Sequence, residues 1–96
     1  MIDEEKVQEM YQENLYRYTF YAARYRGNAA REAIFWEIVS STMRLGKILG
    51  YTEAQVTADM RKRLTDMYGE YADHIYYEEQ GARLLVDHLN GGDNNA

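Results

Sequence analysis

The residues best suited to chemistry lie between Asn14 and Arg31, in a segment without acidic residues although the whole chain is acidic. Arginine and aromatic side chains alternate along it. A guanidinium group binds phosphates and carboxylates and stacks on flat rings, and a helix expected to begin after Asn28 would present its positive end to an anion. The segment therefore predicts a site for an anionic ligand, such as a nucleotide or a cyclic-nucleotide signal. Its candidate residues are Arg17, Arg24, Arg26, Arg31, Tyr16, Tyr21, Tyr25 and Asn28.

The same tyrosines also fit the interior of a helical bundle. Tyr11, Tyr18 and Tyr25 are seven residues apart, which is the spacing of a buried seam. In this interpretation the rings form the core and the arginines pair with glutamates of neighbouring helices, and the seven-residue spacing favours it. Asn14 falls within the seam, where it either fixes the register of an oligomer or bonds a tyrosine hydroxyl inside one subunit.

Two helix faces predict contact with another chain. Tyr16 and Phe20 lie on the side of the first helix that points away from its apolar face, and aromatic side chains are typical of protein interfaces. The second helix is apolar on two opposite sides, so it is either central in the bundle or part of an interface between subunits. We therefore expect a homo-oligomer. Its predicted interface residues are Tyr16, Phe20, Trp36, Val39 and Met43.

No metal or catalytic site is predicted. Glu70, His74 and Glu78 are four residues apart along one helix face, which could suit metal ligands but is far more typical of a solvated face with i,i+4 contacts. The chain has no cysteine, and no Gly-rich phosphate loop or nucleophile motif occurs. With two histidines and no recognisable acid–base pair, we expect neither a cofactor nor an enzyme activity.

Local signals define the elements that must position these residues. Gly27 and Asn28 form a helix boundary, the first as a C-terminal glycine and the second as an N-cap. Gly50 ends the next helix, and Thr52 with Gln55 is a capping box that begins another. Together with the apolar periodicity, these signals predict helices over about residues 3–26, 29–49 and 53–89.

The fold class that follows is all-α, a small bundle of three helices. An unbroken third helix would be about 55 Å long at 1.5 Å per residue, which exceeds a compact domain of this size, so we expect a break near Gly69 that creates a fourth helix. Residues 1–90 are predicted to form a single helical domain, and residues 91–96 a disordered polar tail. A core this small gains stability from assembly, which again predicts an oligomer.

Composition narrows the functional classes. The chain has 96 residues and a net charge of −5, so direct DNA binding is not expected. The longest apolar run, residues 33–36, is too short to span a membrane, and the acidic start differs from a secretory signal, so we expect a cytoplasmic protein. Two alternatives to anion binding fit as well. One is a protein–protein inhibitor or adaptor with an acidic, aromatic surface, of the kind phages direct at host factors, and the other is a self-assembling structural helical module.

Overall fold

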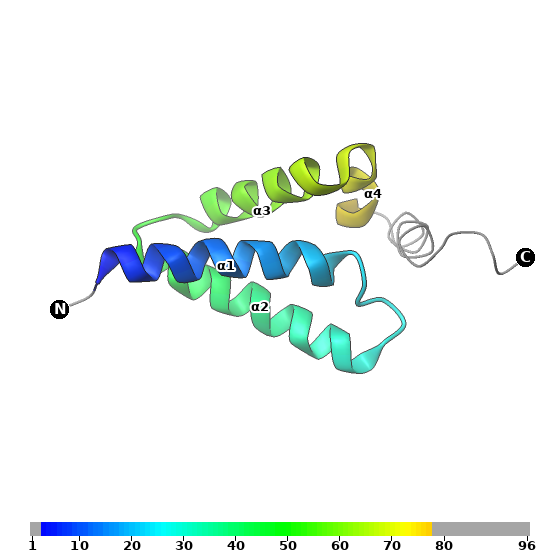
Figure 1. Ribbon diagram of the computed structural model, residues 1–96, viewed down its shortest axis with the longest axis horizontal. Coiled ribbons are helices and arrows are strands. Elements are labelled where there is room, and N and C mark those ends of the chain that lie inside the picture. Colours follow the sequence, from blue (N-terminus) through cyan, green and yellow to red (C-terminus); the bar gives the residue numbers. More distant parts are fainter. Residues whose placement is uncertain (1–2, 78–96) are drawn as a thin grey trace, which may run out of the picture.

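The computed structural model describes residues 3–77, and every regular element in that range is helical. The helices are α1 (Glu4–Ala22), α2 (Ala29–Ile48) and α3 (Glu53–Tyr68), followed by the short 3-10 turn η1 (Gly69–Tyr71) and the short helix α4 (Ala72–Tyr77) (Figure 1). The predicted all-α bundle of three helices is confirmed. None of the described helices is both long and apolar enough to cross a membrane.

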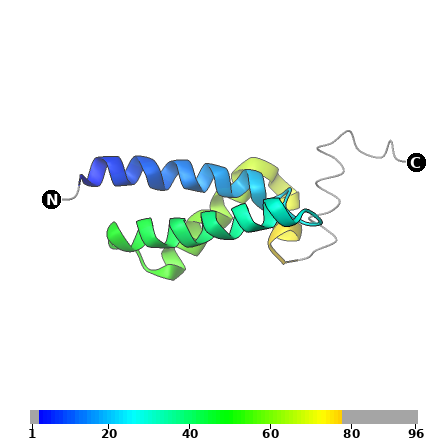
Figure 2. The same ribbon diagram turned by 90° about the horizontal axis from the view of Figure 1, so that it is seen from below.

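Helix α1 packs lengthwise against both of the other long helices. It runs between α2 and α3 in Figure 1, and the turned view of Figure 2 places it on one side of that pair. It packs more extensively against α2 than against α3. One side of α1 therefore faces the core, and the opposite side is left uncovered by the described residues.

The two predicted helix starts are confirmed by their capping bonds. The Asn28 side-chain oxygen accepts the backbone N–H of Arg31 at 3.0 Å, which begins α2. At α3, Thr52 Oγ1 accepts the backbone N–H of Gln55 at 3.1 Å, and the Gln55 side chain accepts the N–H of Thr52 at 2.7 Å. These bonds satisfy backbone donors that have no partner inside a helix, so local sequence decides both boundaries.

Helix α1 ends at Ala22, so the prediction that it continues to about Arg26 was wrong. The backbone N–H groups of Arg24 and Tyr25 both bond the Tyr21 carbonyl, and the chain turns away from the helix axis. This turn buries the ring of Tyr25 against Phe35 of α2, with ring centroids 4.2 Å apart. The stabilisation from stacking two buried rings exceeds that from one more helical turn. As a result, Arg24 and Arg26 lie in the α1–α2 connection.

The core combines tyrosine with aliphatic side chains. Its buried members are Tyr11, Leu15, Tyr18, Ala22, Ala23, Tyr25, Phe35, Ile38, Leu45, Val56, Met60, Leu64, Ala72 and Ile75. The expected burial of Tyr11, Tyr18 and Tyr25 is thus confirmed. Asn14 lies at its edge and donates from Nδ2 to Ser41 Oγ of α2 at 2.9 Å, so its partner within the subunit is a serine and not the tyrosine hydroxyl that one of the two interpretations named. This hydrogen bond joins α1 to α2.

Helix α2 is not covered on both sides by the residues that the structure describes. Phe35 and Ile38 are buried, but Trp36 is 53% exposed, and Val39 and Met43 are half-buried. Within the described residues, the second apolar side of α2 therefore borders solvent. Its use as an interface between subunits stays a prediction.

The break near Gly69 occurs where the sequence placed it. Helix α3 ends at Tyr68, and Gly69 has a φ of +59°, a conformation that side chains other than glycine rarely adopt. Met67, in the last turn of α3, is half exposed. The length of the last helix, Glu78 and the predicted tail of residues 91–96 lie outside the described residues.

Candidate functional site

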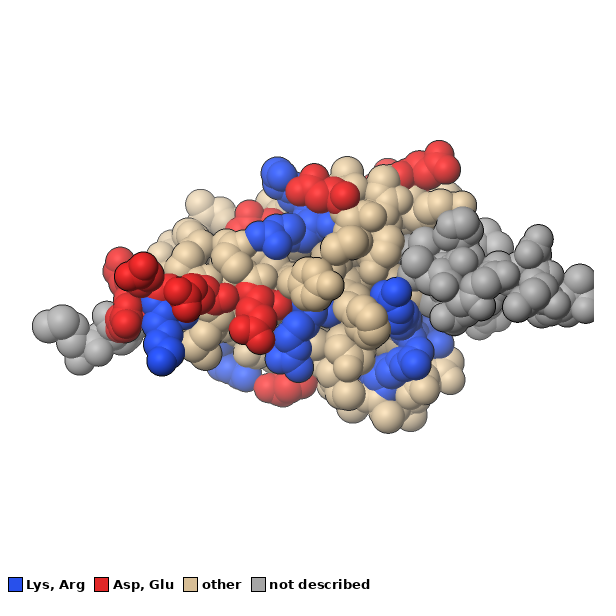
Figure 3. All heavy atoms as spheres, in the orientation of Figure 1, with Lys and Arg blue, Asp and Glu red and all other residues tan. Residues whose placement is uncertain are grey.

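Three of the four candidate arginines gather at the connection between α1 and α2. Arg24 and Arg26 lie in the connection itself, and Arg31 is in the first turn of α2, where its Nη1 donates to the Arg24 carbonyl at 3.5 Å. Figure 3 shows basic side chains at the corresponding end of α1, while acidic ones gather over its other end. Arg17 is separate from this group and lines a different hollow.

Arg24 is engaged in structural bonds. Its Nη1 donates to the Phe20 carbonyl at 3.0 Å and to the Tyr68 hydroxyl at 3.3 Å, and its guanidinium lies 4.0 Å from the centre of the Phe20 ring. The Tyr68 hydroxyl in turn donates to the Thr19 carbonyl at 2.9 Å. Arg24 therefore satisfies a carbonyl at the end of α1 and joins that end to α3.

The candidate tyrosines do not converge on one point. Tyr25 is buried and parallel to Phe35, with an interplanar angle of 7°. Tyr21 contacts Phe20 edge to face at 5.2 Å, and Tyr16 is 60% exposed. Asn28, the remaining candidate, is engaged as the N-cap of α2. Of the predicted ligand residues, Tyr25 and Arg26 face a common hollow.

That hollow, which we call the aromatic groove, has a volume of about 330 Å³ and lies where the end of α1 meets α2 and α3. It brings together residues from two separate predictions. Tyr25 and Arg26 were predicted to bind a ligand, and Trp36, Val39 and Met43 were predicted to form an interface. The groove is lined by Tyr18, Ala22, Tyr25, Arg26, Phe35, Trp36, Val39, Met43, Thr57, Met60 and Ile75.

Arg26 is the one charged residue among these lining residues. Its guanidinium lies 4.8 Å from the centre of the Tyr25 ring. Its Nε is buried and has no hydrogen-bond partner in the part of the chain that the structure describes. A buried donor left unpaired costs roughly 1–3 kcal/mol, and more when the group is charged. Arg26 thus holds an unused donor at the wall of an apolar groove.

Trp36 forms the rim of the groove. Its ring meets Phe35 at 4.9 Å with an interplanar angle of 73°, and it meets Tyr25 at 6.3 Å and 67°. These edge-on contacts fix the ring while half of its surface stays exposed. A flat ring entering the groove would find the indole beside it.

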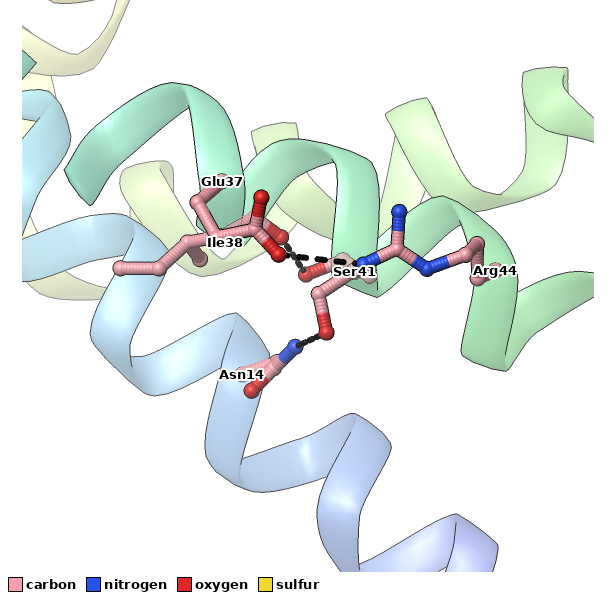
Figure 4. A network of polar contacts seen from close by, with 6 residues as sticks. Asn14, Glu37, Ile38, Ser41 and Arg44 are labelled. Atoms are coloured by element: carbon pink, nitrogen blue, oxygen red, sulfur yellow. Dashed lines mark hydrogen bonds and ion pairs between the residues drawn. The ribbon is translucent and has the colours of Figure 1, made fainter. Parts of the chain in front are cut away.

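A second hollow, between α1 and α2, has a volume of about 410 Å³. Three of its polar residues, Asn14, Ser41 and Glu37, are paired with each other or with a close neighbour. Figure 4 shows Asn14 of α1 pointing to Ser41 of α2, and Glu37 pairing with Arg44 at 3.1 Å. Arg17 lies at this hollow, away from the three arginines of the connection. Because these donors and acceptors are paired, this hollow is the weaker candidate for a ligand.

Comparison with protein-family models, curated protein sequences and solved structures finds no match to this chain. The chemistry of the two hollows is therefore the basis for a functional assignment. Among the residues that the structure describes, no group of three or more His, Asp or Glu side chains is placed to hold a metal ion. The aromatic groove offers ring faces, apolar walls and one cation.

Sequence reasoning missed the residues that complete the groove from other elements. Phe35 supplies the ring on which Tyr25 stacks, and Thr57 and Met60 of α3 form part of its wall. The adjacent aromatics at 35 and 36 were a usable signal, because neighbouring helix positions point about 100° apart and one of two large rings tends to stay near the surface. No comparable signal marks Thr57.

Proposed function

We propose that this chain is a non-enzymatic binding protein that captures, in its aromatic groove, a small ligand combining a flat ring with an anionic group. Nucleotides and cyclic nucleotides have this composition. The observation that carries the proposal is the buried, unpaired Nε of Arg26 at the wall of a groove built from aromatic rings. An anionic oxygen is the partner that such a donor lacks.

Size and polarity support a ligand of this kind. Ligand pockets usually enclose roughly 300–1,000 Å³ and combine apolar walls with a few polar groups, and the groove, at about 330 Å³, is at the small end of that range. The Trp36 indole at the rim suits stacking on a base. Arg26 would meet the phosphate or carboxylate, and Arg31 and Arg24 add positive potential at the same end of α1.

Trp36 provides a direct measurement, because it is the only tryptophan in the chain. We expect its fluorescence to change saturably when AMP or cyclic AMP is added, and to change little with inorganic phosphate, which has no ring to stack. Replacing Arg26 by glutamine removes the charge while keeping an amide of similar length. We expect Arg26→Gln to weaken binding at least about tenfold, because a charge-assisted bond is lost.

Arg44→Gln is the matched control for this titration. Arg44 is an exposed arginine of α2 whose guanidinium pairs with Glu37 outside the groove, so its loss should leave the affinity unchanged. Circular dichroism would show that both variants keep their helices. Equal affinities for the wild type and Arg26→Gln would contradict the proposal, and so would the absence of any saturable signal with ring-bearing anions.

A further inference from the structure

The outer face of α1 is divided by charge along its length. Three glutamates, Glu5, Glu9 and Glu13, outnumber Lys6 in its N-terminal part, while Arg17 follows toward its other end and Arg24 lies just beyond that end. Figure 3 shows this division, with acidic side chains over one end of α1 and basic ones toward the other. None of the groove-lining residues belongs to this face, so its role is separate from that of the groove.

Two exposed aromatic rings lie between the charged ends. Tyr16 is 60% exposed and Phe20 is 43% exposed, and they are one helical turn apart. Phe20 keeps this exposure although the Arg24 guanidinium lies over one face of its ring, and aromatic residues dominate the energetics of protein interfaces. The centre of this face thus has the composition of a contact surface.

The charges beside these rings have no salt-bridge partners among residues 3–77. The structure places Arg44, Arg61 and Lys62 in ion pairs, but within residues 3–77 it gives none to Glu9, Glu13 or Arg17. Like charges at i and i+4, such as Glu9 and Glu13, repel each other on an isolated helix. An opposing surface with the reverse order of charges would relieve this repulsion.

We propose that a second copy of this chain packs on the outer face of α1, with the two α1 helices antiparallel. A two-fold axis near Tyr16 reverses the direction of the second helix, so the acidic part of each copy faces the basic part of the other. Glu13 of each copy then lies near Arg17 of its partner, and the rings of Tyr16 and Phe20 are covered between them. Parallel packing would instead set acid against acid.

The order of charges identifies the partner. A foreign protein with a uniformly basic surface would match the acidic part of α1 but would be repelled by Arg17 and Arg24. A second copy matches both parts at once, because complementarity under a two-fold rotation requires opposite charges on either side of the axis. The surface is therefore better suited to self-pairing than to inhibition of a nucleic-acid-binding protein.

A charge exchange tests this arrangement with the full chain. Sedimentation velocity of the wild type should show a dimer that dissociates as salt is raised. Glu13→Lys places two basic side chains beside the two-fold axis and Arg17→Glu places two acidic ones there, so each variant alone should dimerise at least about tenfold more weakly. Mixed in equal amounts, the two variants should form a heterodimer again, because opposite charges then face each other at both contacts.

Glu53→Lys is the control, since it makes the same charge change at the start of α3, away from the hollow that Arg17 lines, and should leave the dimer intact. Arg24 is kept because it bonds the end of α1 and Tyr68. A wild type that remains monomeric at roughly 100 µM, where micromolar self-association would be nearly complete, overturns the proposal. A mixture of the two variants that remains monomeric overturns it as well, even if the wild type dimerises through another surface.

Discussion

Replacing Gly46 with alanine is expected to destabilise the bundle by about 1–2 kcal/mol, although alanine is the better helix former by about 1 kcal/mol. Gly46 is buried within α2 and has an ordinary helical conformation, so steric space and not backbone freedom requires glycine there. An added Cβ would collide with Cγ2 of Val56 and lie 3.5 Å from Cε1 of Tyr11. Overpacking of this kind typically costs about 1–3 kcal/mol. Urea denaturation followed by circular dichroism would measure the difference.

The background variant Val56→Ala makes this prediction specific. It removes the methyl group that the new Cβ would meet, so Gly46→Ala should become neutral or stabilising when both changes are present. Val56→Ala alone should cost about 2 kcal/mol, because it removes two methyl groups from a fully buried side chain. If Gly46→Ala has the same cost in both backgrounds, the close approach of α2 to α3 is not the reason that position 46 requires glycine.

Replacing Tyr11 with phenylalanine is expected to cost about 1.5–3 kcal/mol, the usual contribution of a hydrogen bond to a charged group. The Tyr11 ring is completely buried between the helices, and its hydroxyl donates to Oδ2 of Asp59 on α3 at 2.7 Å. Phenylalanine keeps the ring but leaves the carboxylate without this donor. Tyr16→Phe is the control, since the Tyr16 ring is exposed, and it should change the unfolding free energy by less than about 0.5 kcal/mol.

The same hydroxyl predicts a dependence on alkaline pH. Burial, followed by the hydrogen bond and the negative charge of Asp59, raises the pKa of Tyr11 well above its ordinary value. A group whose pKa is higher in the folded state stabilises the fold below its unfolded pKa, which is about 10 for tyrosine. That stability falls as pH rises further, by about 1.4 kcal/mol for each pH unit. The stability lost between pH 9 and pH 11 should therefore be smaller in Tyr11→Phe than in the wild type, and an equal loss would contradict the assignment.

The fold could be predicted from the sequence wherever short-range chemistry decides it. Asn28 and Thr52 cap helices with bonds that span three residues, and Gly69 supplies a backbone conformation that few other residues adopt. The end of α1 could not be predicted in this way. Its position depends on the stacking of Tyr25 on Phe35, ten residues further along the chain, and apolar periodicity carries no information about such a pair.

The candidate site was predicted less well, for a geometric reason. A segment that is rich in arginine and tyrosine forms a cluster in the sequence, but consecutive residues of a helix point in all directions around its axis. Arg17 and Tyr16 are therefore separated from Arg26, although ten residues or fewer lie between them. The groove in which Arg26 lies is assembled from four helices, α1 to α4, and only the tertiary structure shows which side chains meet there.

The contacts that join α3 to α1 have a further consequence. This helix packs less extensively on α1 than α2 does, and it is joined to α1 by polar bonds at Asp59, at Tyr68 and between Arg63 and Gln12. Because less packing holds α3 on α1 than holds α2 there, we expect α3 to open locally before α2 does. Because α3 also supplies Thr57 and Met60 to the groove, opening would dismantle the wall around a bound molecule. A bound ligand would therefore stabilise the closed position of α3, and the amide-exchange protection of α3 should increase as the groove is occupied.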